Sequence, residues 1–534
     1  MSEEEKISSE SAEEVKETSA PAEAPAEVSA SGEAAAVKSP HKGFFGKVDN
    51  YFGITKSGSN YKKEIIAGVT TFMAMVYILM VNAGMFQYVI GGDNPYGAAY
   101  IATAIGAVAG TLLMAFLAKM PLAQASGMGV NAFIVYTLIL GGTGLSYANC
   151  MVFTLLDGVI FVILTATGLR QKIFAAIPKA VRYAIPVGIG LFIAFIGMQN
   201  AGIIINDAEI LFGAEGPFIN TATIVEFVSF NVLADGFTFG GIIAPLVAIL
   251  GVIAIAIMSK KNVKGAILWG ILGSTVLYYI FTAIGYAAGD VICKGVFESI
   301  SIEDPFKAFG AWGKDSAGKV FYEGFDFSGY LGIEGNNAGT LIVLLITTAL
   351  SLCMIDMFDT IGTLYGACSK GDLLDENGAP LNMNKMMLSD AVATCIGAAA
   401  GTSTVTTFVE SSSGVAAGGR TGFTALVTAV LFLIAMFLSP IAQLIPSAAT
   451  ATALIWVGVL MMTSVIKVDW EDPAEAIVAF LTFIVMVLGY SISKGIGIGI
   501  IAYILVKVCT GKVKEVSIPT WVIGVLFLAT FILT

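Results

Sequence analysis

Apolar windows recur along the chain and alternate with shorter polar segments. Each window holds about 20 residues, which is enough for a helix to cross about 30 Å of hydrocarbon. The pattern therefore predicts an all-α polytopic membrane protein with about 14 transmembrane helices. The predicted spans are 63–88, 97–118, 122–141, 147–168, 181–204, 238–259 and 265–289, followed by 339–368, 386–402, 404–419, 421–440, 446–466, 473–492 and 495–510. A last apolar stretch, 517–534, is either one more span or a segment that pairs with its neighbours.

The composition supports this interpretation. Apolar residues make up 56% of the 534 residues and charged residues only 13%, and the mean hydropathy is +0.84. Soluble domains carry about 25% charged residues, so an ordinary soluble protein is excluded. The 60 glycines favour close helix packing and interrupted helices within a membrane.

Residues 1–42 differ from the rest of the chain. The first 40 residues contain ten Glu and three Lys, which account for −7 of the formal net charge of −11. Because large apolar residues are scarce here, we expect a disordered acidic tail on the cytoplasmic side. The tail has no apolar core of the kind that a signal peptide needs. Residues 43–62 are the predicted cytoplasmic juxtamembrane segment.

A long polar segment over 290–338 divides the spans into two groups of seven. Seven is odd, so the second group enters the membrane with the opposite orientation, as in the inverted repeats of secondary transporters. The predicted repeats are 63–289 and 339–534, with 290–338 as an extracellular loop. Basic residues place the N-terminus inside by the positive-inside rule. They are Lys119, Arg170, Lys172, Lys179, Arg182, Lys260, Lys261, Lys264, Lys370, Lys385, Arg420, Lys467, Lys507, Lys512 and Lys514, with Lys494 as the exception.

The third span of each group is predicted to be broken. In the first, "SGMG" (126–129) interrupts the apolar run and precedes Asn131; in the second, a β-branched run over 402–408 indicates extended chain before a short helix. Gly127, Gly129 and Gly414 are the predicted helix breaks. Interrupted spans at matching positions in both halves point to a binding site near the membrane midplane. Two ordinary helices with loose glycine packing are the alternative.

Few residues carry chemistry. The single histidine, His41, lies in the tail, and the six cysteines form no CxxC pair. We therefore expect no enzyme, no catalytic residues, no cofactor and no metal site. Three carboxylates nevertheless lie within the predicted spans 339–368 and 404–419: Asp356, Asp359 and Glu410. Because a charge at the bilayer centre costs at least ~2.5 kcal/mol, such residues indicate function.

Several motifs together resemble those of the AzgA-like purine permeases. They are "NYFGI", "EIIAGVTTFMAMVYILMVN" (64–82), "SGMGVNAF" (126–133), "MFDTIGTLYG" (357–366) and "VESSSGVAAGGRTGFTALV" (409–427). This family belongs with the nucleobase-cation symporter-2 and nucleobase-ascorbate transporters. The resemblance implies a seven-plus-seven inverted repeat in which a core domain (helices 1–4 and 8–11) moves against a gate domain (5–7 and 12–14). It also implies that Asn131, Asp356, Asp359 and Glu410 bind the base or couple protons.

The chemistry of these residues suits a purine. An ionised carboxylate is an acceptor for ring N–H groups, and an amide both donates and accepts. Glu410, Asp356 and Asn131 are therefore the predicted base contacts, and Phe408 and Phe358 the predicted stacking surfaces. Asp359 is the predicted proton carrier, because burial penalises its charged form.

Other arrangements of the acidic residues stay open at this stage. The two aspartates can exchange roles, and one of them can instead cap the broken helix or pair with Arg420. Asp157 and Asp390 are interpreted as interhelical hydrogen-bond partners or as residues at cytoplasmic helix ends, and not as substrate contacts.

The leading hypothesis is a plasma-membrane importer of guanine, hypoxanthine, adenine or xanthine, driven by proton symport. A sodium-coupled nucleobase carrier and an inorganic anion transporter on the same architecture are the alternatives. Glu410 at a helix start argues against an anion, which a carboxylate repels. The expected partners are the purine, protons or sodium, the lipid bilayer and a second copy of the chain as a homodimer, with no nucleic acid.

Overall fold

The structure is a computed structural model that describes residues 43–168, 177–204, 239–298, 304–371, 373–375 and 379–533. The predicted tail over residues 1–42 lies outside these ranges, as do Arg170 and Lys172. Within them, ten helices are long and apolar enough to cross a membrane, and shorter apolar helices accompany them. The predicted all-α membrane architecture is confirmed.

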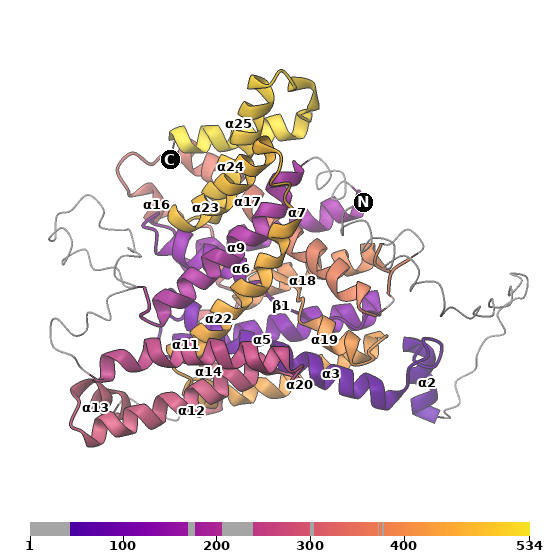
Figure 1. Cartoon of the computed structure of the whole chain (residues 1–534), viewed down its shortest axis with the longest axis vertical. Coiled ribbons are helices and arrows are strands. Elements are labelled where there is room, and N and C mark those ends of the chain that lie inside the picture. The colour runs from indigo at the N-terminus through magenta and orange to yellow at the C-terminus, as the bar shows by residue number, and fades with distance from the viewer. Residues whose placement is uncertain are drawn as a thin grey trace, which may run out of the picture.

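The first group of spans follows the predicted order (Figure 1). Span three is broken as predicted: a short strand is followed by a short helix and a π-helical segment. The elements are α3 (Tyr61–Met75) with α4 (Tyr77–Phe86), α5 (Pro95–Leu113) with η1 (Met114–Ala118), β1 (Gln124–Ser126) with α6 (Met128–Ala132) and η2 (Phe133–Ile139), α7 (Tyr147–Ala166), α9 (Lys179–Asn200), α11 (Phe239–Lys260) and α12 (Ala266–Ala287).

The second group repeats this order, again with a strand in its third span. Its elements are α17 (Ala338–Ser369), α18 (Met383–Ala400), β2 (Val405–Thr407) with α19 (Ser411–Ala416), α20 (Gly422–Ala435) with η5 (Met436–Leu438) and α21 (Ser439–Ala442), α22 (Ser447–Met461) with η6 (Met462–Lys467), α23 (Pro473–Leu488) and α24 (Ile492–Cys509). After η7 (Val513–Glu515), the last apolar stretch forms a separate helix, α25 (Ile518–Leu533), which packs on α24 and α17.

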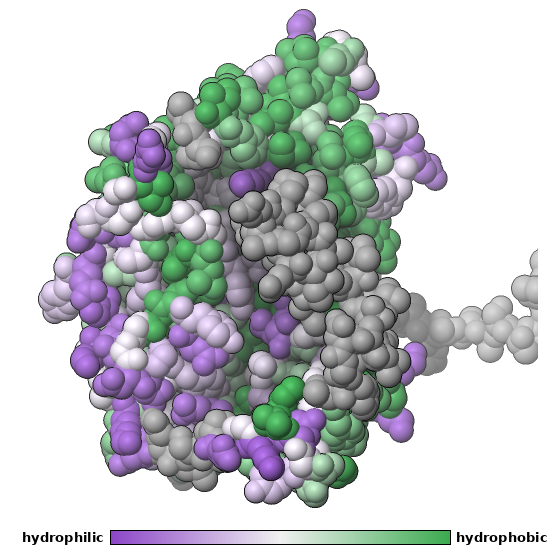
Figure 2. All heavy atoms as spheres, turned by 90° about the vertical axis from the view of Figure 1, so that its left-hand side faces the viewer, coloured by the Kyte–Doolittle hydropathy of each residue, from purple (hydrophilic) through white to green (hydrophobic). Residues whose placement is uncertain are grey.

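The segment between the two groups contains short helices. They are α13 (Val291–Glu298), α14 (Pro305–Asp315), α15 (Lys319–Tyr322) and α16 (Ser328–Leu331), and α14 packs on α5. Figure 2 views the side of the molecule that carries α13 and α16: hydrophilic residues are numerous there, and hydrophobic residues gather towards the top, where α25 lies. The short helix α2 (Gly43–Phe52) lies on the other side, beside the start of α3.

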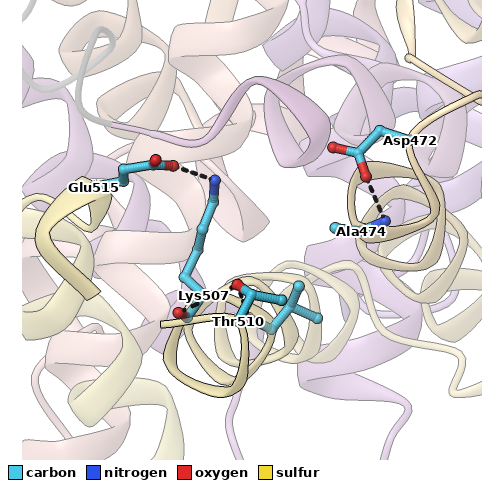
Figure 3. Close-up of polar contacts among 6 residues, drawn as sticks. Asp472, Ala474, Lys507, Thr510 and Glu515 are labelled. Carbon is cyan, nitrogen blue, oxygen red and sulfur yellow. Dashed lines mark hydrogen bonds and ion pairs between the residues drawn. The ribbon is translucent and has the colours of Figure 1, made fainter. Parts of the chain in front are cut away.

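Side-chain caps explain where many of these helices begin. The Asn60 side chain accepts from the Lys63 amide at the start of α3, and Ser146 and Asn337 form capping boxes for α7 and α17. At α23, the Asp472 carboxylate accepts from the Ala474 amide at 2.9 Å (Figure 3). Near the end of α24, Lys507 forms an ion pair of 2.5 Å with Glu515, where the helix dipole favours a cation (Figure 3).

Most of the helix packing lies within two groups, and contacts such as α4 with α22 and α9 with α6 and α17 join them. In one group α3 packs on α20, α5 on α18 and α4, and α7 on α18 and α17; in the other α9 packs on α22 and α23, α11 on α12 and α22, and α23 on α24. The resemblance assigns the first of these groups to a core domain and the second to a gate domain, and this assignment stays a prediction. Only 28% of the apolar window of α11, and 28% of that of α12, is buried within the protein. These two helices therefore lie at the periphery.

Candidate functional site

Two three-residue strands bring the broken spans together. β1 and β2 pair antiparallel, with Gln124 opposite Thr407 and Ser126 opposite Val405. The pairing continues at both ends, because the Gly127 amide donates to the Thr404 carbonyl at 2.8 Å and the Phe408 amide to the Ala123 carbonyl at 3.1 Å. Both strands are fully buried, so the ladder satisfies extended backbone at a depth where water cannot. The alternative of two unbroken glycine-rich helices is wrong.

A cavity of about 480 Å³ lies beside these strands, and residues of both helix groups line it. This volume is within the range of small-molecule sites. α6, α17 and the β2–α19 connection form one wall, and α9, α22 and η6 form the other. Five predicted site residues meet here: Gly129, Phe358, Asp359, Phe408 and Glu410.

Glu410 is held by a tyrosine from another helix. The Tyr77 hydroxyl of α4 donates to Glu410 Oε1 at 2.7 Å, and Tyr77 is fully buried. Glu410 precedes α19, and its side chain makes no cap hydrogen bond to that helix. The carboxylate therefore keeps acceptor capacity for a ligand in the cavity.

Asp359 lies on the face of α17 that lines the cavity. The lining residues on this helix recur every three or four positions, which is the spacing of one helical face. They are Ile355, Phe358, Asp359, Gly362, Thr363, Gly366 and Lys370. Thr406 Oγ1 of β2 donates to Asp359 Oδ2 at 3.3 Å, so a strand residue that sequence reasoning missed orients this carboxylate.

Two of the predicted base contacts do not line the cavity. Asp356 is fully buried one turn before Asp359, and it is absent from the cavity wall. Asn131 is also fully buried: its Oδ1 accepts from Ser126 Oγ at 2.9 Å and from Ser403 Oγ. Asn131 thus links the ends of the two strands behind the cavity.

Asp390 of α18 connects the strands to the core helices. It accepts hydrogen bonds from Gln124 Nε2 of β1, from Thr360 Oγ1 of α17 at 2.8 Å and from Thr407 Oγ1 of β2 at 2.9 Å. The interpretation of Asp390 as an interhelical hydrogen-bond partner is confirmed. Through these bonds it fixes the position of β2 relative to the helix that carries Asp359.

A buried carboxylate that sequence reasoning missed holds the start of α20. Glu64 of α3 is fully buried and accepts from the Arg420 and Thr421 amides at 3.0 and 3.3 Å. The Thr421 and Thr424 hydroxyls also donate to it, at 2.9 and 2.6 Å. The Arg420 guanidinium donates instead to the Val415 and Gly419 carbonyls. The acidic partner at this helix start is therefore Glu64, and neither aspartate of α17 has that role.

The three predicted break glycines lie in different settings. Gly127 stands between β1 and α6, where the break occurs. Gly129 lies within α6, where an added Cβ would come within 2.8 Å of Ile189 Cγ2. Gly414 lies inside α19, contrary to the prediction of a break. An added Cβ there would be 2.7 Å from the Ala67 carbonyl oxygen and would overlap Thr71 Oγ1, so this glycine lets α19 pack closely on α3.

Aspartate, glutamate, cysteine and histidine side chains are the groups that most often hold a metal ion in a protein. In the part of the chain that the structure describes, no three of them gather in a way that could hold a metal ion. The cavity lining offers hydrogen-bond acceptors, aromatic faces and two exposed lysines, Lys370 and Lys467.

Comparison with known proteins identifies the family. A family model described as "Permease family" (Xan_ur_permease) matches residues 62–498. The guanine/hypoxanthine permease PbuO of Bacillus subtilis is 35% identical, over 89% of this chain and 98% of that protein. The adenine permease AdeQ of Escherichia coli is 34% identical, over 91% and 97%.

Solved structures give the same fold. The transmembrane domain of the cyanobacterium bicarbonate transporter BicA aligns with a TM-score of 0.54 at 16% identity, over 81% of this chain and 97% of that one, a likeness that shows the fold alone. With a family match over most of its length and relatives at these identities, the chain belongs to this permease family, as its resemblance to the AzgA-like purine permeases predicted.

Proposed function

We propose that this permease imports purine nucleobases by proton symport. One observation carries the proposal: Asp359 and Glu410 line a single cavity, and helices of both groups form its walls. The printed names of the relatives, a guanine/hypoxanthine permease and an adenine permease, support a purine as the substrate.

Glu410 is the proposed base contact. Its carboxylate faces the cavity, and the Tyr77 hydroxyl fixes one of its oxygens. The remaining lone pairs accept ring N–H groups of the base, and Phe358 and Phe408 offer aromatic faces for stacking. Asp356 and Asn131 are proposed to support this wall, since neither lines the cavity in this conformation.

Asp359 is the proposed proton carrier. It lines the cavity and is partly buried, and burial penalises the charged form of a carboxylate. Protonation removes a charge that repels Glu410, so both carboxylates can then face one bound base. Movement of the gate group against the core group would expose the cavity to alternate sides of the membrane, as in other transporters with this architecture.

We propose the plasma membrane as the location, with the N-terminus in the cytoplasm. The lysines on the α2 side support this orientation, because cytoplasmic loops carry an excess of basic residues. The division into repeats at 63–289 and 339–534, with 290–338 outside, belongs to the same proposal, as does a homodimer.

Uptake of labelled bases tests the proposal. Cells that lack their own nucleobase permeases would express the chain and receive labelled guanine, hypoxanthine, adenine, xanthine or uracil. We expect uptake of purines that a protonophore abolishes and that persists when choline replaces sodium. Purine uptake that requires sodium and resists the protonophore would contradict proton coupling, and the absence of any purine uptake would contradict the substrate.

An inorganic anion is the second candidate, because Lys370 and Lys467 line the same cavity. Among the described residues, neither lysine forms an ion pair with a carboxylate. Labelled bicarbonate and sulfate in the same uptake assay distinguish this candidate. Anion uptake without purine uptake would favour it.

A further inference from the structure

A second cavity lies on the α2 side, apart from the one that contains Glu410. It measures about 550 Å³ and is lined by α2 together with the start of α3, η1 and α20. Its walls are aromatic: Phe44, Phe45, Tyr51 and Phe52 from α2 face Phe116 and Phe423 from the bundle. We call this cavity the α2 groove.

One wall of the α2 groove is fixed and the other is open. Phe52 is buried and packs against Phe116 and Phe423, with ring centroids 5.7 and 5.9 Å apart. In contrast, Phe44 and Phe45 are 74% and 61% exposed. Exposed aromatic residues beside a transmembrane bundle are typical of the membrane–water interface. On this basis we expect the groove to open at the level of the lipid headgroups.

The exposed charges on the described segments around the groove are all positive. Lys47, Lys56, Lys62, Lys63 and Lys119 are all exposed. Lys47 lines the groove itself, and the Lys119 ammonium lies 4.0 Å from the centre of the Tyr51 ring.

The neighbouring acidic side chains are turned inward. Asp49 is 2% exposed and accepts from the Thr55 amide and hydroxyl at 2.8 and 2.6 Å. Glu64 is bound to the start of α20, as described above. Neither carboxylate offsets the lysines at the surface, so the rim of the groove presents a net positive charge.

We propose that the α2 groove binds an anionic phospholipid, with an acyl chain between its aromatic walls and the headgroup against Lys47 and Lys119. Anionic leaflets attract basic segments next to transmembrane helices, and an apolar groove accepts an acyl chain. A free phosphate matches the lysines but not the aromatic walls. The acidic segment 1–42 matches the lysines too, but it contains no Phe, Leu, Trp or Tyr to fill the groove.

Native mass spectrometry of the purified full-length chain tests this site. The protein is mixed with equal amounts of phosphatidylglycerol and phosphatidylcholine, and bound lipids are counted. We expect phosphatidylglycerol to bind at least fivefold more than phosphatidylcholine. In the double variant Lys47→Gln/Lys119→Gln this ratio falls to about one, because the headgroup loses its cations.

Matched variants distinguish lipid binding in the groove from attraction of lipid to basic residues in general. Lys260→Gln/Lys261→Gln removes two lysines at the end of α11 and should leave the lipid ratio unchanged. Phe44→Ser/Phe45→Ser should lower the binding of both lipids without lowering the melting temperature, since both rings are exposed.

Two results would overturn the proposal. One is equal loss of the lipid preference in the α11 and groove lysine variants. The other is a preference for phosphatidylglycerol that emerges only after residues 1–42 are deleted, because the acidic segment would then occupy the groove in the full chain. Purine binding should be the same in the groove variants as in the parent, so this test is independent of the proposed transport function.

Discussion

The hydroxyl of Tyr77 offers a specific test of how the cavity is organised. Its Oη lies 2.7 Å from Glu410 Oε1, and both side chains come from elements that are far apart in sequence. Tyr77→Phe removes this one donor and keeps the ring that fills the space. Without the hydroxyl, the Glu410 side chain loses the hydrogen bond that Tyr77 donates to it, so the incoming base must order this side chain.

The expected loss of purine affinity follows from the cost of ordering the Glu410 side chain. Fixing a glutamate side chain costs up to about 1.5–2 kcal/mol in rotamer entropy. Since 1.4 kcal/mol corresponds to a tenfold change in affinity, Tyr77→Phe should weaken purine binding about 10- to 30-fold. Equilibrium binding of labelled hypoxanthine to purified protein measures the change directly.

Tyr100→Phe is the matched control for this variant. Tyr100 is also buried, and its hydroxyl donates to the Ala435 carbonyl at 2.9 Å, away from the cavity lining. This variant loses one buried hydrogen bond of similar length, so it should lower stability but leave affinity within about twofold, well under the 1.4 kcal/mol of a tenfold change. Unchanged affinity in Tyr77→Phe, or equal losses in both variants, would refute the reasoning.

Three further predictions concern coupling and stability. Asp359→Asn should still exchange labelled purine across proteoliposome membranes but no longer accumulate it when a pH gradient is imposed; gradient-driven accumulation at the parent level would exclude Asp359 as the proton carrier. Asp390→Asn should lower the melting temperature by several degrees, because hydrogen bonds to a charged group contribute about 1.5–3 kcal/mol each. An unchanged melting temperature would show that the hydrogen bonds to Asp390 are dispensable for stability. Gly414→Ala should cost about 1–3 kcal/mol through overpacking against α3. Gly84→Ala, where an added Cβ meets nothing within 4 Å, is its control, and equal stability of these two variants would contradict the packing argument.

The spans could be predicted because a bilayer imposes a length and an apolar character on each of them. The broken spans could also be predicted, since "SGMG" and the β-branched run over 402–408 fit neither a continuous helix nor a surface loop. The sequence did not show that the two runs pair with each other. That pairing depends on contacts between segments about 280 residues apart, such as Gly127 with Thr404.

The candidate site was predicted in part. Asp359 and Glu410 stood out because a carboxylate in an apolar span is costly, and both line the cavity. Asp356 is also a carboxylate in an apolar span. A spacing of three residues places it about 60° around the helix from Asp359. Spacing alone does not tell how wide the cavity is, so it could not exclude Asp356 from the cavity wall. Tyr77 and Thr406 gave no signal, because neutral residues within apolar spans are common.

Glu64 was missed for a different reason. It lies near the start of its span and follows Lys62 and Lys63, a pattern that also fits a solvated membrane end. The structure instead buries it completely against the start of α20. Its partners are backbone amides and threonine hydroxyls more than 350 residues away, and a sequence pattern does not reveal such partners.

The central claim is that Glu410 binds a purine in the cavity between the two helix groups. Equilibrium binding of labelled guanine and hypoxanthine to purified Glu410→Ala protein, compared with the parent chain, tests it most directly. The account predicts a loss of affinity of about 10- to 150-fold, from a charge-assisted hydrogen bond of about 1.5–3 kcal/mol, in a protein that melts within a few degrees of the parent. Parent-like affinity in a well-folded Glu410→Ala variant would contradict it.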